Sequence, residues 1–183
     1  GYAALVLAVT LLEFALAWVL RARRLPEQRI GPIRTLMMIG SEFVTLLGSA
    51  WRMMTYRRRM RDPAPAPARV PIVLVHGVLC NAGVWAPMAR KLAAADLGPV
   101  YALSYGPPLV TINEFVSQLD ERIDSVVAAT GASQVVIVAH SMGGLVARAY
   151  LHAFGGARIA RVVMIGTPHH GSVYAFFVPG ACI

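Results

Sequence analysis

The stretch "VIVAHSMGGLVAR", Val136–Arg148, combines a strand-forming run, a turn of small residues and a helix-forming run, with Ser141 at the apex of the turn. A strand that folds sharply into a helix needs small residues around the apex, because the two elements approach closely there. Ala139, Gly143 and Gly144 meet that demand. Ser141 is then either a nucleophile at a helix N-terminus, where N–H groups favour developing negative charge, or an incidental serine in a tight turn.

Short apolar runs alternate with helix-forming segments from Arg69 onward. The apolar runs predict four strands, at residues 70–77, 99–106, 134–140 and 160–168. Helical spacing of apolar residues predicts helices at 82–95, from Thr111 to about Val126, and at 142–154. Thr111 and Glu114 have the spacing of a capping box. Apolar strands separated by helices predict an α/β fold with a parallel sheet covered on both faces, in which ligands bind beyond the carboxyl ends of the strands.

A second glycine-permitted turn follows the first predicted strand, at His76, Gly77 and Val78. The N–H of Val78 and the N–H of Met142 are two backbone donors placed after strands, where they would face the oxygen of a tetrahedral intermediate. Losing one such donor typically costs about 3 kcal/mol of transition-state stabilisation. The two turns together predict an oxyanion hole.

Three segments resemble motifs of the α/β-hydrolase superfamily, and specifically of bacterial triacylglycerol lipases and related esterases. They are "VLVHGVLCNAGVW", "VAHSMGGLVAR" and "IGTPHHGS", in the order that this group shows, and the resemblance covers about residues 70–172. The resemblance implies an α/β-hydrolase fold. It also implies a serine hydrolase of carboxylic esters, in particular lipid esters, that works through an acyl-enzyme.

The same resemblance implies a role for each motif residue. Ser141 is the nucleophile, and the backbone N–H groups of Val78 and Met142 form the oxyanion hole. His140 is an elbow residue rather than the base, and His76 supports the oxyanion turn. The residues that support the two turns are then His76, Gly77, His140, Gly143 and Gly144. Neither a metal nor a cofactor is implied.

The catalytic acid and the base are not identified by these motifs. The fold orders its triad as serine, then Asp or Glu, then histidine, but no Asp or Glu follows Asp124. His169 and His170 are weak candidates for the base, and His152 falls in mid-helix. We expect residues 70–183 to be the N-terminal part of a hydrolase domain, incomplete at its C-terminus, and the 183 residues alone to be poorly active.

Three other functions remain open from the sequence. A membrane-tethered acyltransferase or thioesterase shares the nucleophile elbow and the acyl-enzyme, and differs in the acceptor that attacks it. A non-catalytic hydrolase-like membrane protein would keep the elbow in a binding or scaffolding role. A Cys80 nucleophile is the weakest of the three, because Cys80 follows the oxyanion turn and does not lie on an elbow.

The segment 1–61 is predicted to anchor the protein to a membrane. Residues 2–20 carry one charge, Glu13, and are long enough to cross a hydrocarbon core of about 30 Å as a transmembrane helix; a signal peptide and a buried soluble helix are the alternatives. A second hydrophobic helix at about 36–51 is expected to lie amphipathically in the interface rather than to span or to pack on a partner. The segment 62–69, "DPAPAPAR", predicts an extended linker.

Charge is concentrated in the same N-terminal segment. Hydrophobic residues make up 57% of the chain and the net charge is +8, of which residues 1–62, with ten Arg against four acidic residues, contribute +6. Because these Arg flank apolar runs, anionic lipid headgroups are the expected partner and nucleic acid is not. The predicted location is the bacterial inner membrane, and the Arg clusters favour the cytoplasmic face for the catalytic domain.

Overall fold

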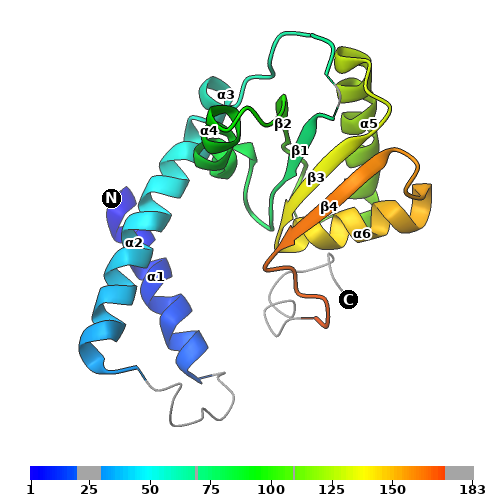
Figure 1. The fold of residues 1–183 in the computed structure, drawn as a ribbon. Helices are drawn as coiled ribbons and strands as arrows, with labels where there is room; N and C mark the ends of the chain where they lie inside the picture. Colours follow the sequence, from blue (N-terminus) through cyan, green and yellow to red (C-terminus); the bar gives the residue numbers. More distant parts are fainter. Residues whose placement is uncertain (20–29, 69, 109, 172–183) are drawn as a thin grey trace. The chain divides into compact units, whose positions relative to one another are not determined.

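The computed structural model describes residues 1–19, 30–68, 70–108 and 110–171 and divides the chain into two compact units, Gly1–Arg52 and Met53–Ile183 (Figure 1). The division falls earlier than the predicted boundary at residue 61. Helix α2, which supplies most of the second half of the first unit, ends two residues beyond the division.

The first unit contains two helices, α1 (Tyr2–Val19) and α2 (Pro32–Met54). They touch where the Tyr2 hydroxyl donates a hydrogen bond to the carbonyl oxygen of Leu47, at 3.2 Å. Among the described residues, α1 is the one helix long and apolar enough to cross a membrane, a property that a signal sequence near the N-terminus shares. Helix α2 is longer than the predicted 36–51 because Pro32, whose fixed φ suits a first helical position, begins it.

The second unit is built on four parallel strands in the order β2-β1-β3-β4. They are β1 (Ile72–Val75), β2 (Val100–Leu103), β3 (Val135–His140) and β4 (Ile159–Ile165). The predicted α/β class and parallel sheet are therefore confirmed. From β1 the chain goes to β2, on one side of β1, and then returns to β3, on the other side of β1. The direction in which strands are added therefore reverses between β1 and β3. The carboxyl ends of these two strands form the place where such sheets bind ligands.

Helices cover both faces of the sheet, as the apolar strands predict. A 3-10 turn, η2 (Ala82–Trp85), and α4 (Ala86–Ala94) lie on one face, while α5 (Ile112–Thr130) and α6 (Met142–Phe154) lie on the other (Figure 1). Side chains alternate along β1: Val73 and Val75 join the core under α5 and α6, and Ile72 and Leu74 join the core under η2 and α4. The short helix α3 (Tyr56–Arg59) precedes this sheet.

Helix α5 begins as expected but not with the predicted cap. Thr111 is its N-cap residue, yet the threonine side chain makes no capping hydrogen bond, and the N–H of Glu114 bonds to the Thr111 carbonyl oxygen instead, at 3.1 Å. The apolar face is confirmed, with Phe115, Val116, Leu119, Ile123 and Val126 buried. Burial of this face, rather than the capping box, therefore holds α5 on the sheet.

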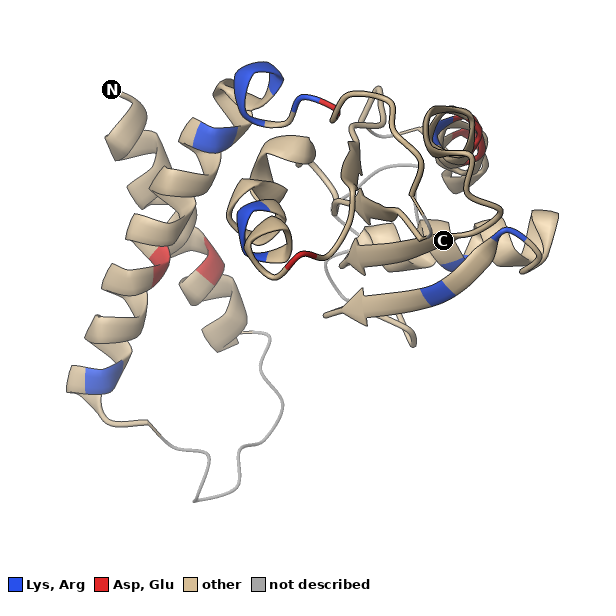
Figure 2. Cartoon of the chain, turned by 45° about the horizontal axis from the view of Figure 1, so that its top comes forward, with Lys and Arg blue, Asp and Glu red and all other residues tan. Residues whose placement is uncertain are grey.

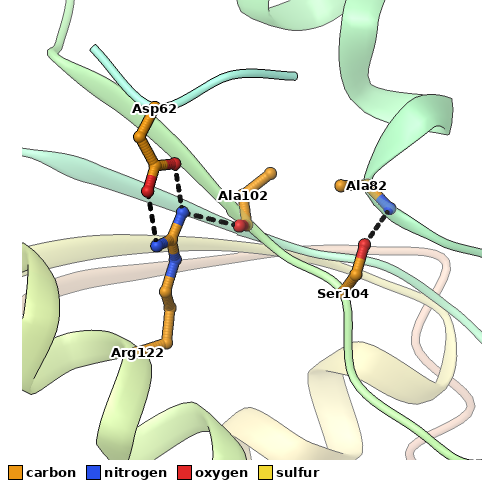
Figure 3. Close-up of polar contacts among 5 residues, drawn as sticks. All are labelled: Asp62, Ala82, Ala102, Ser104 and Arg122. Carbon is orange, nitrogen blue, oxygen red and sulfur yellow. Dashed lines mark hydrogen bonds and ion pairs between the residues drawn. The ribbon is translucent and has the colours of Figure 1, made fainter. Parts of the chain in front are cut away.

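The predicted linker contains no helix or strand at residues 61–68 and is held on the second unit. Asp62 receives two hydrogen bonds from the Arg122 guanidinium, one of 2.8 Å (Figure 3). The N–H of Ala68 donates to the carbonyl oxygen of Thr130 at 3.1 Å. Arg122 also donates to the carbonyl oxygen of Ala102, at 2.9 Å, and lies over the Tyr101 ring. The start of the linker is thus part of the surface of the sheet unit.

Replacing Arg122 by Met should lower the free energy of unfolding by about 1.5–3 kcal/mol, because the Ala102 carbonyl and Asp62 lose charge-assisted hydrogen bonds. Asp62 is the matched control: its side chain is 48% exposed, so Asp62→Asn should cost less than about 1 kcal/mol. Urea denaturation of both variants measures the difference. Equal stabilities for Arg122→Met and the wild type would show that Arg122 does not hold the segment.

Candidate active site

Ser141 lies between the end of β3 and the first residue of α6, and its backbone is strained. Its φ of 53° and ψ of −125° fall in a region that residues with side chains rarely adopt. The Ser141 N–H donates to the carbonyl oxygen of Ile165 at 2.9 Å, which fixes the serine to the neighbouring strand β4. A strained serine at this position of a strand-to-helix turn is typical of a nucleophile elbow, and Ser141 is half-buried at the carboxyl edge of the sheet.

The two glycines after Ser141 are required by close packing. A Cβ atom on Gly143 would lie 2.4 Å from the carbonyl oxygen of His76 and 2.6 Å from that of Val75, so the first turn of α6 rests directly on the backbone of β1. A Cβ atom on Gly144 would lie 2.0 Å from the Thr167 hydroxyl oxygen. The structure thus confirms the predicted need for small residues after the serine.

The turn after β1 lies against Ser141. A Cβ atom on Gly77 would be 3.0 Å from the Cβ of Ser141, and the Cys80 N–H donates to the Gly77 carbonyl oxygen at 3.4 Å to close the turn. Leu79, the third residue of that turn, has a left-handed φ of 54°. The two predicted turns are therefore adjacent in space, although about sixty residues separate them in sequence.

A cavity of about 160 Å³ opens beside these turns. Both predicted oxyanion donors, Val78 and Met142, contribute to its wall. Most of its other lining is apolar or aromatic. The lining residues are His76, Gly77, Val78, Leu79, Cys80, Tyr105, Pro108, Phe115 and Met142.

His76 is buried and fixes the Gly77 peptide. Its Nδ1 lies 2.8 Å from the Gly77 carbonyl oxygen, which can only accept, so Nδ1 carries the proton. Its Nε2 accepts from the N–H of Tyr105, whose ring stacks on the imidazole at 4.1 Å and whose hydroxyl donates to the His76 carbonyl at 2.6 Å. Since the peptide is planar, holding the Gly77 carbonyl also fixes the direction of the Val78 N–H.

The other histidines do not meet Ser141 in the described part of the chain. His140 is exposed and makes an edge contact with Trp85. His169 lies 3.2 Å from an Arg148 guanidinium nitrogen, and His170 is exposed. No histidine among the described residues forms a hydrogen bond with the Ser141 hydroxyl, so the structure does not assemble either predicted candidate, His169 or His170, into a dyad.

Cys80 and Tyr105 complete the wall of the cavity. Burial raises the pKa of the Cys80 thiol, which favours the less nucleophilic protonated form. Tyr105 was not predicted as a site residue. The sequence signal that could have identified Tyr105 is its position just beyond β2, at the carboxyl edge of the sheet. The described residues hold no group of His, Cys, Asp and Glu side chains arranged to bind a metal ion.

Gly143→Ala should lower the free energy of unfolding by about 1–3 kcal/mol or more, because the added methyl group meets backbone carbonyl oxygens that cannot rotate away. Gly156 offers the control, since a Cβ atom there meets nothing within 4 Å. Gly156→Ala should stay within about 0.5 kcal/mol of the wild type. Thermal or urea unfolding compares the two, and equal effects would contradict the close approach of α6 to β1.

The stability of the second unit should also depend on His76 and pH. Desolvation lowers the pKa of His76 below its usual 6.5, so the unfolded chain binds a proton that the folded one resists. The free energy of unfolding should therefore fall as pH drops below about 6.5, by up to about 1.4 kcal/mol per pH unit, and this component should be missing in His76→Gln. Parallel pH profiles for the two proteins would show that His76 is not buried in its neutral form.

Residues 69–180 match the model of the family described as Lipase (class 2). Two proteins named triacylglycerol lipase, from Pseudarthrobacter phenanthrenivorans and Burkholderia plantarii, are each 35% identical to this chain over 126 residues. These matches cover 62% of this chain but 37% and 33% of the relatives, so the chain spans little more than a third of their length.

Solved structures show the same fold. The mature form of the Bacillus licheniformis lipase BlEst2 matches with a TM-score of 0.52 and 26% identity, over 63% of this chain and 49% of that protein. The phospholipase PlaB from Legionella pneumophila matches with a TM-score of 0.51 and 18% identity, over 62% of this chain and 30% of that protein, which supports the fold alone. With its parallel sheet, its strand order and a family match over more than half of its residues, the chain belongs to the class 2 lipase family of α/β-hydrolases.

Proposed function

We propose that this protein is a serine hydrolase of carboxylic esters, of the lipase or esterase type, with Ser141 as its nucleophile. One observation carries the proposal: Ser141 has a strained backbone with positive φ at the end of β3 and lies against the glycine turn that ends β1. Strain at a serine that a glycine would relieve is typical of a functional site. Membership of a family named for lipases supports the same chemistry.

In the proposed reaction, the Ser141 Oγ forms a bond to the ester carbonyl carbon and gives its proton to a base. The carbonyl oxygen becomes an oxyanion that accepts hydrogen bonds from the N–H groups of Val78 and Met142. The intermediate expels the alcohol, which takes up the proton, and an acyl-enzyme remains. Water then attacks the acyl-enzyme in the same way, which releases the acid and restores the serine.

The cavity and the His76–Tyr105 pair support the oxyanion part of this proposal. Val78 and Met142 line one cavity, and Gly77, the residue before Val78, lies against Ser141. This arrangement supports a site in which one carbonyl oxygen meets both peptides. The stacked ring of Tyr105 and its hydroxyl hold His76, and His76 holds the Gly77 carbonyl. A donor fixed before substrate arrives needs no reorganisation during the reaction.

The proposed substrates are lipid esters, met at a membrane to which residues 1–61 attach the protein. The relatives that share 35% identity are named triacylglycerol lipases, and helix α1 is apolar enough to enter a bilayer. The Arg residues between and after the two helices of the first unit would contact anionic headgroups. The proposed location is the bacterial inner membrane, with the catalytic unit on the cytoplasmic face.

A fluorophosphonate probe should label Ser141 in any form of the protein that hydrolyses esters, because the probe reacts with activated serines, and Ser141→Ala should abolish the labelling. Ser125, exposed on α5, is the control, and Ser125→Ala should label like the wild type. Persistent labelling of Ser141→Ala would overturn the assignment.

The 183 residues alone should hydrolyse nitrophenyl esters little above background, since they contain no acidic residue after Asp124. Rapid Ser141-dependent turnover of these esters would contradict the expected low activity.

Val78→Pro tests the oxyanion donor. Proline is favoured at the second position of a four-residue turn such as Gly77–Cys80, so the turn can persist while its N–H is removed. In any form of the protein that hydrolyses esters, kcat should fall about 10²–10³-fold with little change in KM. Val78→Ala keeps the N–H and should retain kcat within a few-fold. A similar kcat for both variants would show that this N–H does not contact the oxyanion.

A further inference from the structure

The surface of helix α2 has three distinct sides. At 3.6 residues per turn, Ile33, Met37, Val44 and Trp51 fall within about 40° of one another and form an open apolar side. Ile33, Met37 and Val44 are 73%, 69% and 66% exposed. A polar side is centred about 85° around the helix from the open apolar side. A half-buried apolar side is centred about 150° further on from the polar side. The polar side carries Arg34, Ser41, Thr45 and Arg52, and the half-buried side carries Ile39, Phe43, Leu46 and Ala50.

The half-buried side of α2 is the side that faces α1. The Leu47 carbonyl, next to Leu46, accepts the Tyr2 hydroxyl of α1. Val6 and Thr10, one and two turns after Tyr2 on the same face of α1, are the residues of α1 that are buried. The rest of α1 exposes large apolar side chains. Helix α1 is therefore stacked against α2 on the side opposite its polar residues.

Three hydroxyl groups of the two helices are satisfied by nearby backbone carbonyl oxygens. Thr10 and Ser41 donate to backbone carbonyl oxygens of the preceding turn, at 2.9 Å each, and Thr35 donates to Gly31 at 3.1 Å. Such internal hydrogen bonds allow these residues to enter an apolar environment. Glu42 borders the polar side of α2, and Glu13 of α1 lies close enough to interact with it electrostatically.

Basic residues lie where lipid headgroups would contact the helices. Arg34 and Arg52 lie near the two ends of α2 on its polar side. Figure 2 shows basic segments in blue near both ends of this helix. On α2 the basic polar side is next to an open apolar side, and the apolar helix α1 covers the side opposite the polar residues. A helix pair with one basic side and otherwise apolar surface is suited to lie in the plane of an anionic membrane. Among the described residues, α1 but not α2 is long and apolar enough to cross a membrane.

We propose that α1 and α2 form a hairpin that enters one leaflet of an anionic phospholipid bilayer without crossing it. The polar side of α2 contacts the headgroups, its open apolar side contacts the acyl chains, and α1 lies deeper, on the acyl-chain side of α2. Because α1 is stacked on a helix that lies in the membrane plane, it does not run along the membrane normal. This arrangement replaces the transmembrane α1 expected from the sequence and does not rest on the chemistry proposed for Ser141.

Two neighbouring residues of α2 provide a matched test, because Val44 and Thr45 are both exposed but lie on different sides of the helix. Single cysteines are introduced as Val44→Cys or Thr45→Cys into the full chain with Cys80 and Cys182 replaced by Ala. Membranes containing the protein, and vesicles of phosphatidylcholine and phosphatidylglycerol, are treated with a membrane-impermeant maleimide. Thr45→Cys should react at least tenfold faster than Val44→Cys, and the two rates should become equal in denaturant.

The other arrangements give different results. A spanning α2 would protect both cysteines, and a helix outside the membrane would leave both reactive; either result overturns the proposal. Cysteines at Gly1 and Gly31 then test α1: the hairpin places both on the same side of the membrane. Labelling of Gly1→Cys and Gly31→Cys from opposite sides would show that α1 crosses. Removal of α1 from the mature protein would identify it as a signal sequence and would equally overturn the hairpin.

Discussion

The contact between the first turn of α6 and the end of β1 controls the geometry of the second unit. Gly143 lies so close to the Val75 and His76 carbonyl groups that no side chain fits between them. This contact brings Ser141, the residue before α6, beside Gly77 in the turn that follows β1. If the two elements moved apart by the width of a methyl group, Ser141 and Gly77 would no longer be in contact.

The topology of the sheet makes that contact useful. Strands β1 and β3 are neighbours in the sheet, although β2 comes between them in sequence. The connections that follow β1 and β3 lead to opposite faces of the sheet. Neither connection therefore covers the turns that follow these two strands. Tyr105, just beyond β2, then reaches across to His76 by stacking and by hydrogen bonding. Three consecutive strands of the sheet thus each supply one part of the candidate site.

The sequence predicts the features that depend on local pattern. The four strands, the buried face of α5 and the need for glycine after Ser141 follow from apolar spacing and from the sterics of one turn. Contacts between distant segments are not predicted. Composition marks residues 62–69 as a spacer, but it carries no information about Asp62 meeting Arg122 sixty residues later. Tyr105 was missed for the same reason, since its role depends on β2 lying beside β1. The predicted side-chain cap at Thr111 is wrong because burial of the apolar face holds α5 on the sheet without it.

Leu79 shows a tension between stability and function in this fold. It adopts a left-handed φ of 54° that glycine would accept freely. Its side chain is 68% exposed, so burial of the side chain offsets little of the backbone strain energy. A chain selected for stability alone would carry glycine at this position. The leucine instead places a branched apolar group in the wall of the cavity, next to Val78. Stabilising the protein by relaxing this turn with glycine would therefore remove an apolar side chain from that wall.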